Sequence, residues 1–180
     1  MEFNFSRNYF ELFELETRFH IDTAKLANQY QALQSQFHPD RFIEGNDQAK
    51  RIAMQATTFI NEAHKTLQDE SLRARYLLEL QNVPFNTEKD TTKDMDFLMA
   101  QMSLREQIDE VDRQEDPLES LDDLARQSKQ EKSQLIENYQ TYFNTQQWDE
   151  AKEVVLKLQF FTRLQQQINQ KQEALEDQIL

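Results

Sequence analysis

The sequence predicts an all-helical protein built from two units. Among its 180 residues are only one glycine and three prolines, and helix-favouring Gln, Glu, Leu, Lys, Arg and Ala predominate. A sheet protein would need more glycine in its turns. Apolar residues recur at spacings of three and four, and a polar stretch around Pro84 interrupts this pattern. We therefore expect an N-terminal helical hairpin with two short helices, followed by a C-terminal three-helix bundle.

The first unit, residues 1–82, is expected to begin with a short helix over residues 8–16. A second helix should begin after Asp22-Thr23, which are good N-cap residues. It must end near His38, because Pro39 disfavours the α conformation of the residue before it and cannot donate a backbone hydrogen bond. The apolar stripe expected on this helix consists of Leu26, Tyr30, Leu33 and Phe37.

The rest of the first unit should contain two more helices. A loop over residues 38–46 leads to a third helix, capped by Asn46 or Asp47. A fourth short helix covers about residues 71–80. The stripe expected on the third helix consists of Ile52, Ala56, Phe59, Ile60, Ala63 and Leu67.

A linker and a second unit are expected after residue 82. Residues 83–93 contain a proline, several cap-type residues and no helical period, so we interpret them as the linker. Residues 94–180 should form three longer helices, the first over about 94–113. The second opens at Asp116-Pro117, where aspartate can cap and proline suits the first turn, and the last begins near Trp148. Acidic residues outnumber basic ones far more strongly after residue 82 than before it, which also supports two units.

Composition excludes several function classes. The net charge of −13 argues against nucleic-acid binding, which needs clustered Lys and Arg. The chain has no cysteine, and His20, His38 and His64 do not have metal-ligand spacing, so we expect no metal and no cofactor. No nucleophile arrangement or phosphate loop suggests an enzyme. Because no apolar run approaches the length of a membrane span and no secretion signal is visible, we expect a cytoplasmic protein that binds no membrane.

His38-Pro39-Asp40, between the two helices of the hairpin, is the most distinctive motif. Alone it is weak, because Pro39 could merely end a helix while Asp40 bonds to the turn. Together with Arg41-Phe42 and the segments 9–15, 30–37, 60–69 and 73–76, it resembles the J domain over about the first eighty residues. The resemblance implies that the loop docks on a DnaK-like ATPase and stimulates ATP hydrolysis. The expected chaperone-binding residues are His38, Pro39, Asp40, Arg41 and Lys25.

The second helix departs from the usual J-domain pattern. J domains commonly carry several Lys and Arg there, facing an acidic chaperone surface, whereas Lys25 is the only basic residue between Ala24 and Phe37. Electrostatic steering should therefore be weak, so we expect chaperone stimulation to depend only modestly on salt.

The helix expected from residue 94 has two apolar faces. At about 100° per residue, Phe97, Leu104, Ile108 and Val111 form one face. Four residues form an opposite face: Met95, Leu98, Met99 and Met102. A helix in a small bundle needs only one apolar face, so the second is either another core layer or a protein-binding surface. The stripe expected on the last helix consists of Ala151, Val154, Leu158, Phe161, Gln165 and Ile168, and Phe160 points away from it.

Residues 97–106, Trp148-Asp149 and residues 157–160 resemble the C-terminal domain of HscB-type co-chaperones, so the resemblance covers nearly the whole chain. It implies a co-chaperone that binds the iron–sulfur scaffold protein IscU and delivers it to the DnaK-like chaperone HscA during cluster maturation. Ser103 stands where an acidic residue is usual. A general J protein acting on another client is the alternative, and an enzyme is a weaker one. The expected scaffold-binding residues are Leu98, Met99, Met102, Glu106, Glu110 and Phe160.

Overall fold

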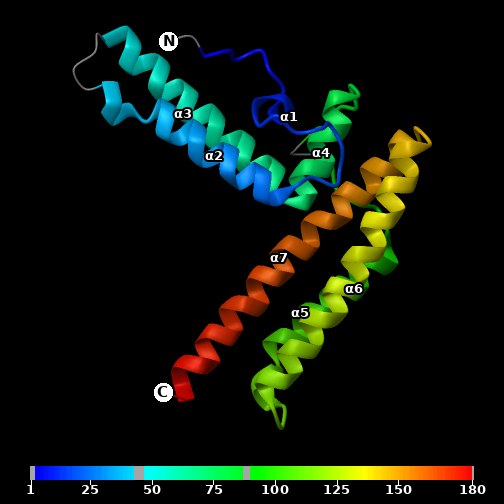
Figure 1. The fold of residues 1–180 in the computed structure, drawn as a ribbon. Helices are drawn as coiled ribbons and strands as arrows, with labels where there is room; N and C mark the ends of the chain where they lie inside the picture. The colour runs from blue at the N-terminus through cyan, green and yellow to red at the C-terminus, as the bar shows by residue number, and fades with distance from the viewer. Residues whose placement is uncertain (1–2, 43–46, 87–89, 180) are drawn as a thin grey trace. The chain divides into compact units, whose positions relative to one another are not determined.

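The computed structural model describes residues 3–42, 47–86 and 90–179, with side chains excluded at residues 41–42 and 178–179. All regular structure in these ranges is helical (Figure 1), which confirms the predicted fold class. The chain divides into two compact units, Met1–Leu80 and Gln81–Leu180. The division lies two residues before the expected end of the first unit at residue 82.

The first unit is a helical hairpin with short helices beside it. Helices α2 and α3 pack side by side and run in opposite directions (Figure 1). Asp22 caps α2 as expected, accepting a hydrogen bond from the Lys25 backbone N at 2.9 Å. The elements of this unit are α1 (Tyr9–Leu12), α2 (Thr23–Phe37), the 3-10 turn η1 (Pro39–Phe42), α3 (Asp47–Gln68) and α4 (Glu70–Leu80).

Helix α1 is shorter than the predicted range of residues 8–16. It ends at Leu12 because Glu14 adopts a left-handed conformation, with φ of 54°. The turn directs the Glu14 carbonyl oxygen toward α2, where it accepts a hydrogen bond from Lys25 Nζ at 2.5 Å. The end of α1 thus coincides with a contact to α2, which the local apolar pattern could not reveal.

The core of the first unit is rich in aromatic rings. Phe10 and Phe13 are fully buried, and the Tyr9 ring stacks on Tyr76 of α4 at 4.4 Å between centroids. On α2 only Leu26 and Phe37 of the expected stripe are buried. Tyr30 and Leu33 are half-buried, because few other elements of this unit pack against α2.

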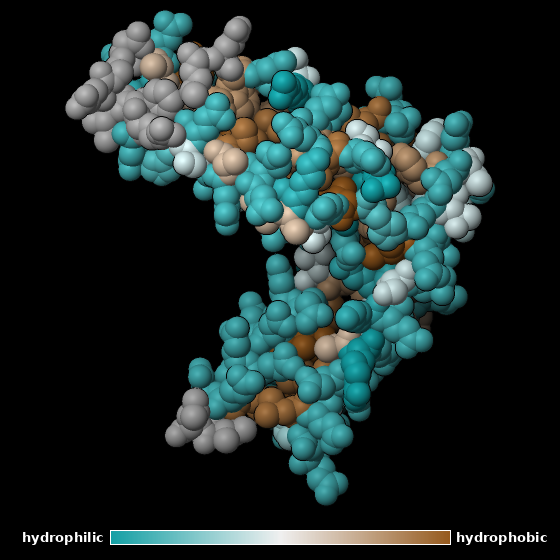
Figure 2. All heavy atoms as spheres, in the orientation of Figure 1, coloured by the Kyte–Doolittle hydropathy of each residue, from teal (hydrophilic) through white to brown (hydrophobic). Residues whose placement is uncertain are grey.

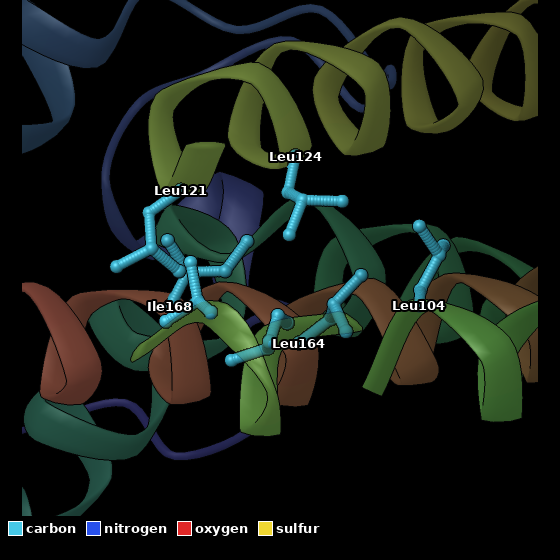
Figure 3. Packing of buried hydrophobic residues seen from close by; sticks show 7 residues of the cluster. Leu104, Leu121, Leu124, Leu164 and Ile168 are labelled. Carbon is cyan, nitrogen blue, oxygen red and sulfur yellow. The ribbon is translucent and has the colours of Figure 1, made fainter. Parts of the chain in front are cut away.

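The second unit is a three-helix bundle. Asp116 caps α6 by accepting a hydrogen bond from the Glu119 backbone N at 3.0 Å, with Pro117 in the first turn as predicted. Its elements are α5 (Met95–Asp109), the 3-10 turn η2 (Val111–Arg113), α6 (Pro117–Asn144) and α7 (Trp148–Ile179). Figure 3 shows apolar side chains from the three helices pointing toward one another in its core. The cluster consists of Leu104, Ile108, Val111, Leu121, Leu124, Leu164 and Ile168.

Two residues of this bundle differ from the sequence pattern. Gln165, expected on the buried stripe of α7, is exposed, and Leu164 is buried in its place. The expected stripe followed a seven-residue period, whereas a straight helix of 3.6 residues per turn drifts away from that period. Gln101 of α5 is 2% exposed although it is polar.

The segment expected to be a linker, residues 83–93, belongs in the structure to the second unit. Among its described residues, Val83 and Thr92 are buried. Lys152 of α7 forms an ion pair with Asp90, with 2.8 Å between Nζ and Oδ2. The segment thus packs along α7 before α5 begins.

Candidate protein-binding sites

The first candidate site is the tip of the hairpin, His38–Asp40. Phe37 is the last residue of α2, and His38 has an extended ψ of 128°, as expected before proline. Pro39 then begins η1, the short 3-10 turn of this unit. The Thr57 hydroxyl of α3 donates to the Phe37 carbonyl oxygen at 3.0 Å, which satisfies one of the free carbonyls at the end of α2.

The tip presents an imidazole and a carboxylate to solvent. The His38 and Asp40 side chains are 54% and 78% exposed, and 3.6 Å separates His38 Nδ1 from Asp40 Oδ2. The Asp40 backbone N donates to His38 Nδ1 at 3.3 Å. The Arg41 side chain lies outside the described residues. This arrangement has a fixed backbone and free polar groups, and is suited to docking on another protein.

Cross-hairpin contacts stiffen the helices behind the tip. Gln34 Nε2 donates at 2.6 Å both to the Tyr30 hydroxyl and to Asn61 Oδ1 of α3. The Tyr30 hydroxyl itself donates to Asn61 Oδ1 at 3.1 Å. The Tyr30 ring stacks on His64 at 3.8 Å between centroids, and burial lowers the pKa of the His64 imidazole. The expected core residue Tyr30 is thus the centre of a polar bridge.

Lys25 lies far from the tip. It is in the first turn of α2, which places it about 18 Å along the helix axis from Phe37 at 1.5 Å per residue. Its ammonium donates to Glu14 O, as described above. The structure therefore does not bring Lys25 together with His38, Pro39 and Asp40.

The second candidate site is a surface of α5 that we call the methionine face, formed by Met95, Leu98, Met99 and Met102. Met95 and Met99 are each 65% exposed and Met102 is 62% exposed, while Leu98 is half-buried. Leu104, Ile108 and Val111 of the opposite side are buried in the core, and Phe97 is half-buried. Within the described residues the methionine face therefore does not form a second core layer.

Two acidic side chains follow the methionine face along the chain, and the expected aromatic residue lies on α7. Glu106 and Glu110 continue along α5 and are exposed, and Glu110 Oε1 accepts a hydrogen bond from Arg113 Nη1 at 2.7 Å. Phe160 of α7 is half-buried and meets the edge of the Phe97 ring, with 5.5 Å between centroids. Ser103 is exposed and accepts a hydrogen bond from Gln107 Nε2 at 3.3 Å.

The surface outside the two sites bears on the sequence expectations of no membrane and no metal. The face drawn in Figure 2 is largely hydrophilic over both units. Among the described residues no helix combines the length and hydropathy needed to cross a membrane. In the same ranges no three His, Asp or Glu side chains gather in a way that could hold a metal ion.

Comparisons with known proteins identify the class. A helical hairpin with an exposed His-Pro-Asp tip, joined to a three-helix unit, defines a J-domain co-chaperone. The family model described as HSCB C-terminal oligomerisation domain matches residues 93–169. The co-chaperone protein HscB homolog of Shewanella baltica is 35% identical over 173 residues, which cover 94% of this chain and 99% of that protein.

Solved structures agree with the sequence comparison. Chaperone HscB from Vibrio cholerae superposes with a TM-score of 0.83 at 34% identity, covering 97% of this chain and all of the other. The human co-chaperone protein HscB superposes with a TM-score of 0.81 at 29% identity, covering 93% and 83% of the two chains. The chain belongs to the HscB family of J-domain co-chaperones, which act in iron–sulfur cluster assembly without being enzymes themselves.

Sequence reasoning missed the polar contacts that support both sites. Asn61 and His64 lie in the segment that resembles a J domain, but their contacts with α2 were not predicted, although Asn61 accepts hydrogen bonds from α2. Lys152 and Lys157 of α7 were not singled out, although each forms an ion pair near the start of α5. At about 100° per residue neither lysine lies on the stripe of Ala151, Val154 and Leu158, so the apolar pattern gave no signal of their partial burial.

Proposed function

We propose that this co-chaperone binds an iron–sulfur scaffold protein of the IscU type on α5 and delivers it to a DnaK-like chaperone of the HscA type. There it stimulates ATP hydrolysis by the chaperone. Two separate surfaces carry out these steps, and the proposed location of the protein is the cytoplasm, where its partners act.

The exposed tip supports the chaperone-binding half of the proposal. The backbone of His38, Pro39 and Asp40 is restrained by the proline ring within it and by the hydrogen bond from Thr57 to Phe37 just before it. A pre-ordered loop loses less conformational entropy on binding than a flexible one. We propose that Arg41 adds a positive charge beside the tip, and that Lys25 contributes a weak contact from the far end of α2.

The methionine face supports the scaffold-binding half, and its exposure is the observation that carries the proposal most strongly. Three methionines more than 60% exposed on one helix form an apolar surface without a partner among the described residues. Methionine side chains adapt to irregular partners, and such surfaces usually mark protein contacts. Leu98, Met99, Met102 and Phe160 would supply apolar contacts, while Glu106 and Glu110 would select a partner with complementary positive charge.

A single substitution tests the chaperone-binding half. His38→Gln should reduce stimulation of single-turnover ATP hydrolysis by an HscA-type chaperone by at least about tenfold, the loss expected when a central polar contact is removed. The fold should be unaffected because the side chain is more than half exposed.

His20→Gln is the matched control. It makes the same chemical change at an exposed position of the same unit, outside the tip. Full stimulation by the His38→Gln protein would refute the role of the tip, and an equal loss in both variants would show that the effect is not specific to it.

A further inference from the structure

Two ion pairs hold the start of α5 and lie outside both sites described above. We call these four residues the clasp: Asp90 with Lys152, and Asp94 with Lys157. Lys152 Nζ lies 2.8 Å from Asp90 Oδ2, and Lys157 Nζ lies 2.6 Å from Asp94 Oδ2. Both lysines belong to α7, and their side chains are only 22% and 17% exposed. They are therefore less screened by solvent than ordinary surface pairs.

The first pair attaches the segment that leads into α5. The Lys152 ammonium also donates to the Pro84 carbonyl oxygen at 2.7 Å and lies 5.0 Å from the centroid of the Phe85 ring. The neighbouring Glu153 accepts a hydrogen bond from the Thr92 hydroxyl. The chain is thus fixed to α7 at several points before the helix begins.

The second pair joins the first turn of α5 to α7. Asp94 Oδ1 caps α5 by accepting a hydrogen bond from the Phe97 backbone N at 3.0 Å, while Oδ2 contacts Lys157. The hydrogen bond from Lys157 lowers the pKa of the Asp94 carboxyl below its ordinary value, so the contact favours the carboxylate form of the cap. The Lys157 ammonium also lies 5.4 Å from the centroid of the Phe97 ring, an attractive cation–π arrangement.

Apolar burial anchors the two halves of α5 unequally. Leu104 and Ile108 of the C-terminal half lie in the core cluster. The N-terminal half turns Phe97 and Gln101 inward, and the buried Nε2 of Gln101 has no hydrogen-bond partner among the described residues. A buried donor without a partner is destabilising. The half that carries the methionine face therefore depends more on the clasp for its position.

We propose that Asp94 and Lys157 are positioning residues for the scaffold-binding surface. Their contact fixes the rotation of the first turns of α5, and so the direction that Met95 and Met99 face. A shift of one residue would turn these side chains by about 100°. Holding them in the bound orientation reduces the entropy lost on association. This inference rests on the proposed function, since it assumes that the methionine face binds the scaffold protein.

Two substitutions break the contact between Asp94 and Lys157 while retaining the size or the capping ability of the side chain. Lys157→Met removes the charge but keeps a long apolar side chain, and Asp94→Asn keeps a good N-cap. Each should weaken the affinity of the full chain for an IscU-type scaffold protein, measured by calorimetry, by about three- to tenfold, as expected for one charge-assisted contact. The double variant should be no weaker than the single ones, because all three lose the same interaction. Lys157→Arg should recover most of the affinity.

Lys171→Met is the matched control. Lys171 is also on α7 and lies 2.6 Å from an aspartate, Asp112 Oδ2, but beyond the end of the methionine face. It should bind the scaffold protein normally. Amide hydrogen exchange over residues 95–102 should accelerate in Lys157→Met and stay unchanged in Lys171→Met, a local effect that general destabilisation would not produce.

The possible failures are distinguishable. The positioning role would be overturned if both clasp variants bound the scaffold protein with unchanged affinity while the combined variant Leu98→Ala, Met99→Ala and Phe160→Ala lost binding. The proposed function would then remain intact. An equal loss in Lys171→Met would also overturn the positioning role. Binding that survives the combined alanine variant would overturn the scaffold-binding assignment, and with it the inference that depends on it.

Discussion

The tip and the methionine face, the two proposed protein-binding surfaces, differ in how their side chains are held. The tip offers His38 and Asp40 on a short turn, held by proline and by hydrogen bonds across the α2–α3 hairpin. The methionine face offers flexible apolar side chains on a regular helix, whose first turns are held by polar contacts as well as by the Phe97 ring. The polar tip thus has a restrained backbone, whereas the methionine face has adaptable side chains on a helix.

The largest expected effect is the difference in the free energy of unfolding between a core substitution and a substitution on the methionine face. Leu121→Ala, at a fully buried position, should lower the free energy of unfolding of the second unit by about 2 to 5 kcal/mol. Met99→Ala should change it by less than about 0.5 kcal/mol, since the side chain is exposed. Urea unfolding followed by the fluorescence of Trp148, the single tryptophan, reports on this unit. A large loss in Met99→Ala would mean that the face is part of the core.

A smaller effect, on the pH dependence of stability, is expected for His64 in the hairpin behind the tip. Burial lowers the pKa of His64 below its usual 6.5, so the folded state favours the neutral imidazole. Below pH 6.5 the unfolded chain binds more protons than the folded chain, and stability should fall as the pH falls toward the folded pKa. His64→Gln should reduce this pH dependence in urea unfolding followed by NMR signals of α3. An unchanged slope between pH 7 and 5 would show that His64 does not contribute to it.

The smallest effect concerns salt. Lys25 is the only basic residue of α2, and it is already bonded to Glu14 at the end remote from the tip. Stimulation of the ATPase should therefore fall only modestly as ionic strength rises through the physiological range, because few interfacial charges are screened. A titration of single-turnover rates against NaCl measures this, and a steep decline would indicate steering charges that α2 does not supply.

The sequence was sufficient for the parts of the fold that depend on local patterns. The caps Asp22 and Asp116, the end of α2 before Pro39 and the surplus apolar side of α5 could all be predicted, because spacing and capping chemistry determine them. The motif and its flanks also led to the correct family.

Contacts between distant segments could not be predicted. The short α1 depends on the turn at Glu14, and the stiff hairpin depends on Asn61 and His64 meeting Tyr30. The burial of Leu164 instead of Gln165 depends on how α7 packs, which a seven-residue stripe does not specify. Each of these requires knowing which elements are neighbours, and the chain order alone does not supply that.

The central claim is that the tip and the methionine face act separately, and one paired measurement tests it most directly. Scaffold affinity by calorimetry and ATPase stimulation without scaffold are measured for two proteins, His38→Gln and the combined variant Leu98→Ala, Met99→Ala and Phe160→Ala. The first should bind the scaffold normally and stimulate poorly. The second should stimulate normally and lose about a hundredfold in scaffold affinity, the loss expected for a cluster of central apolar contacts. If each variant lost both activities while remaining folded, the two sites would not be separate and the account would be wrong.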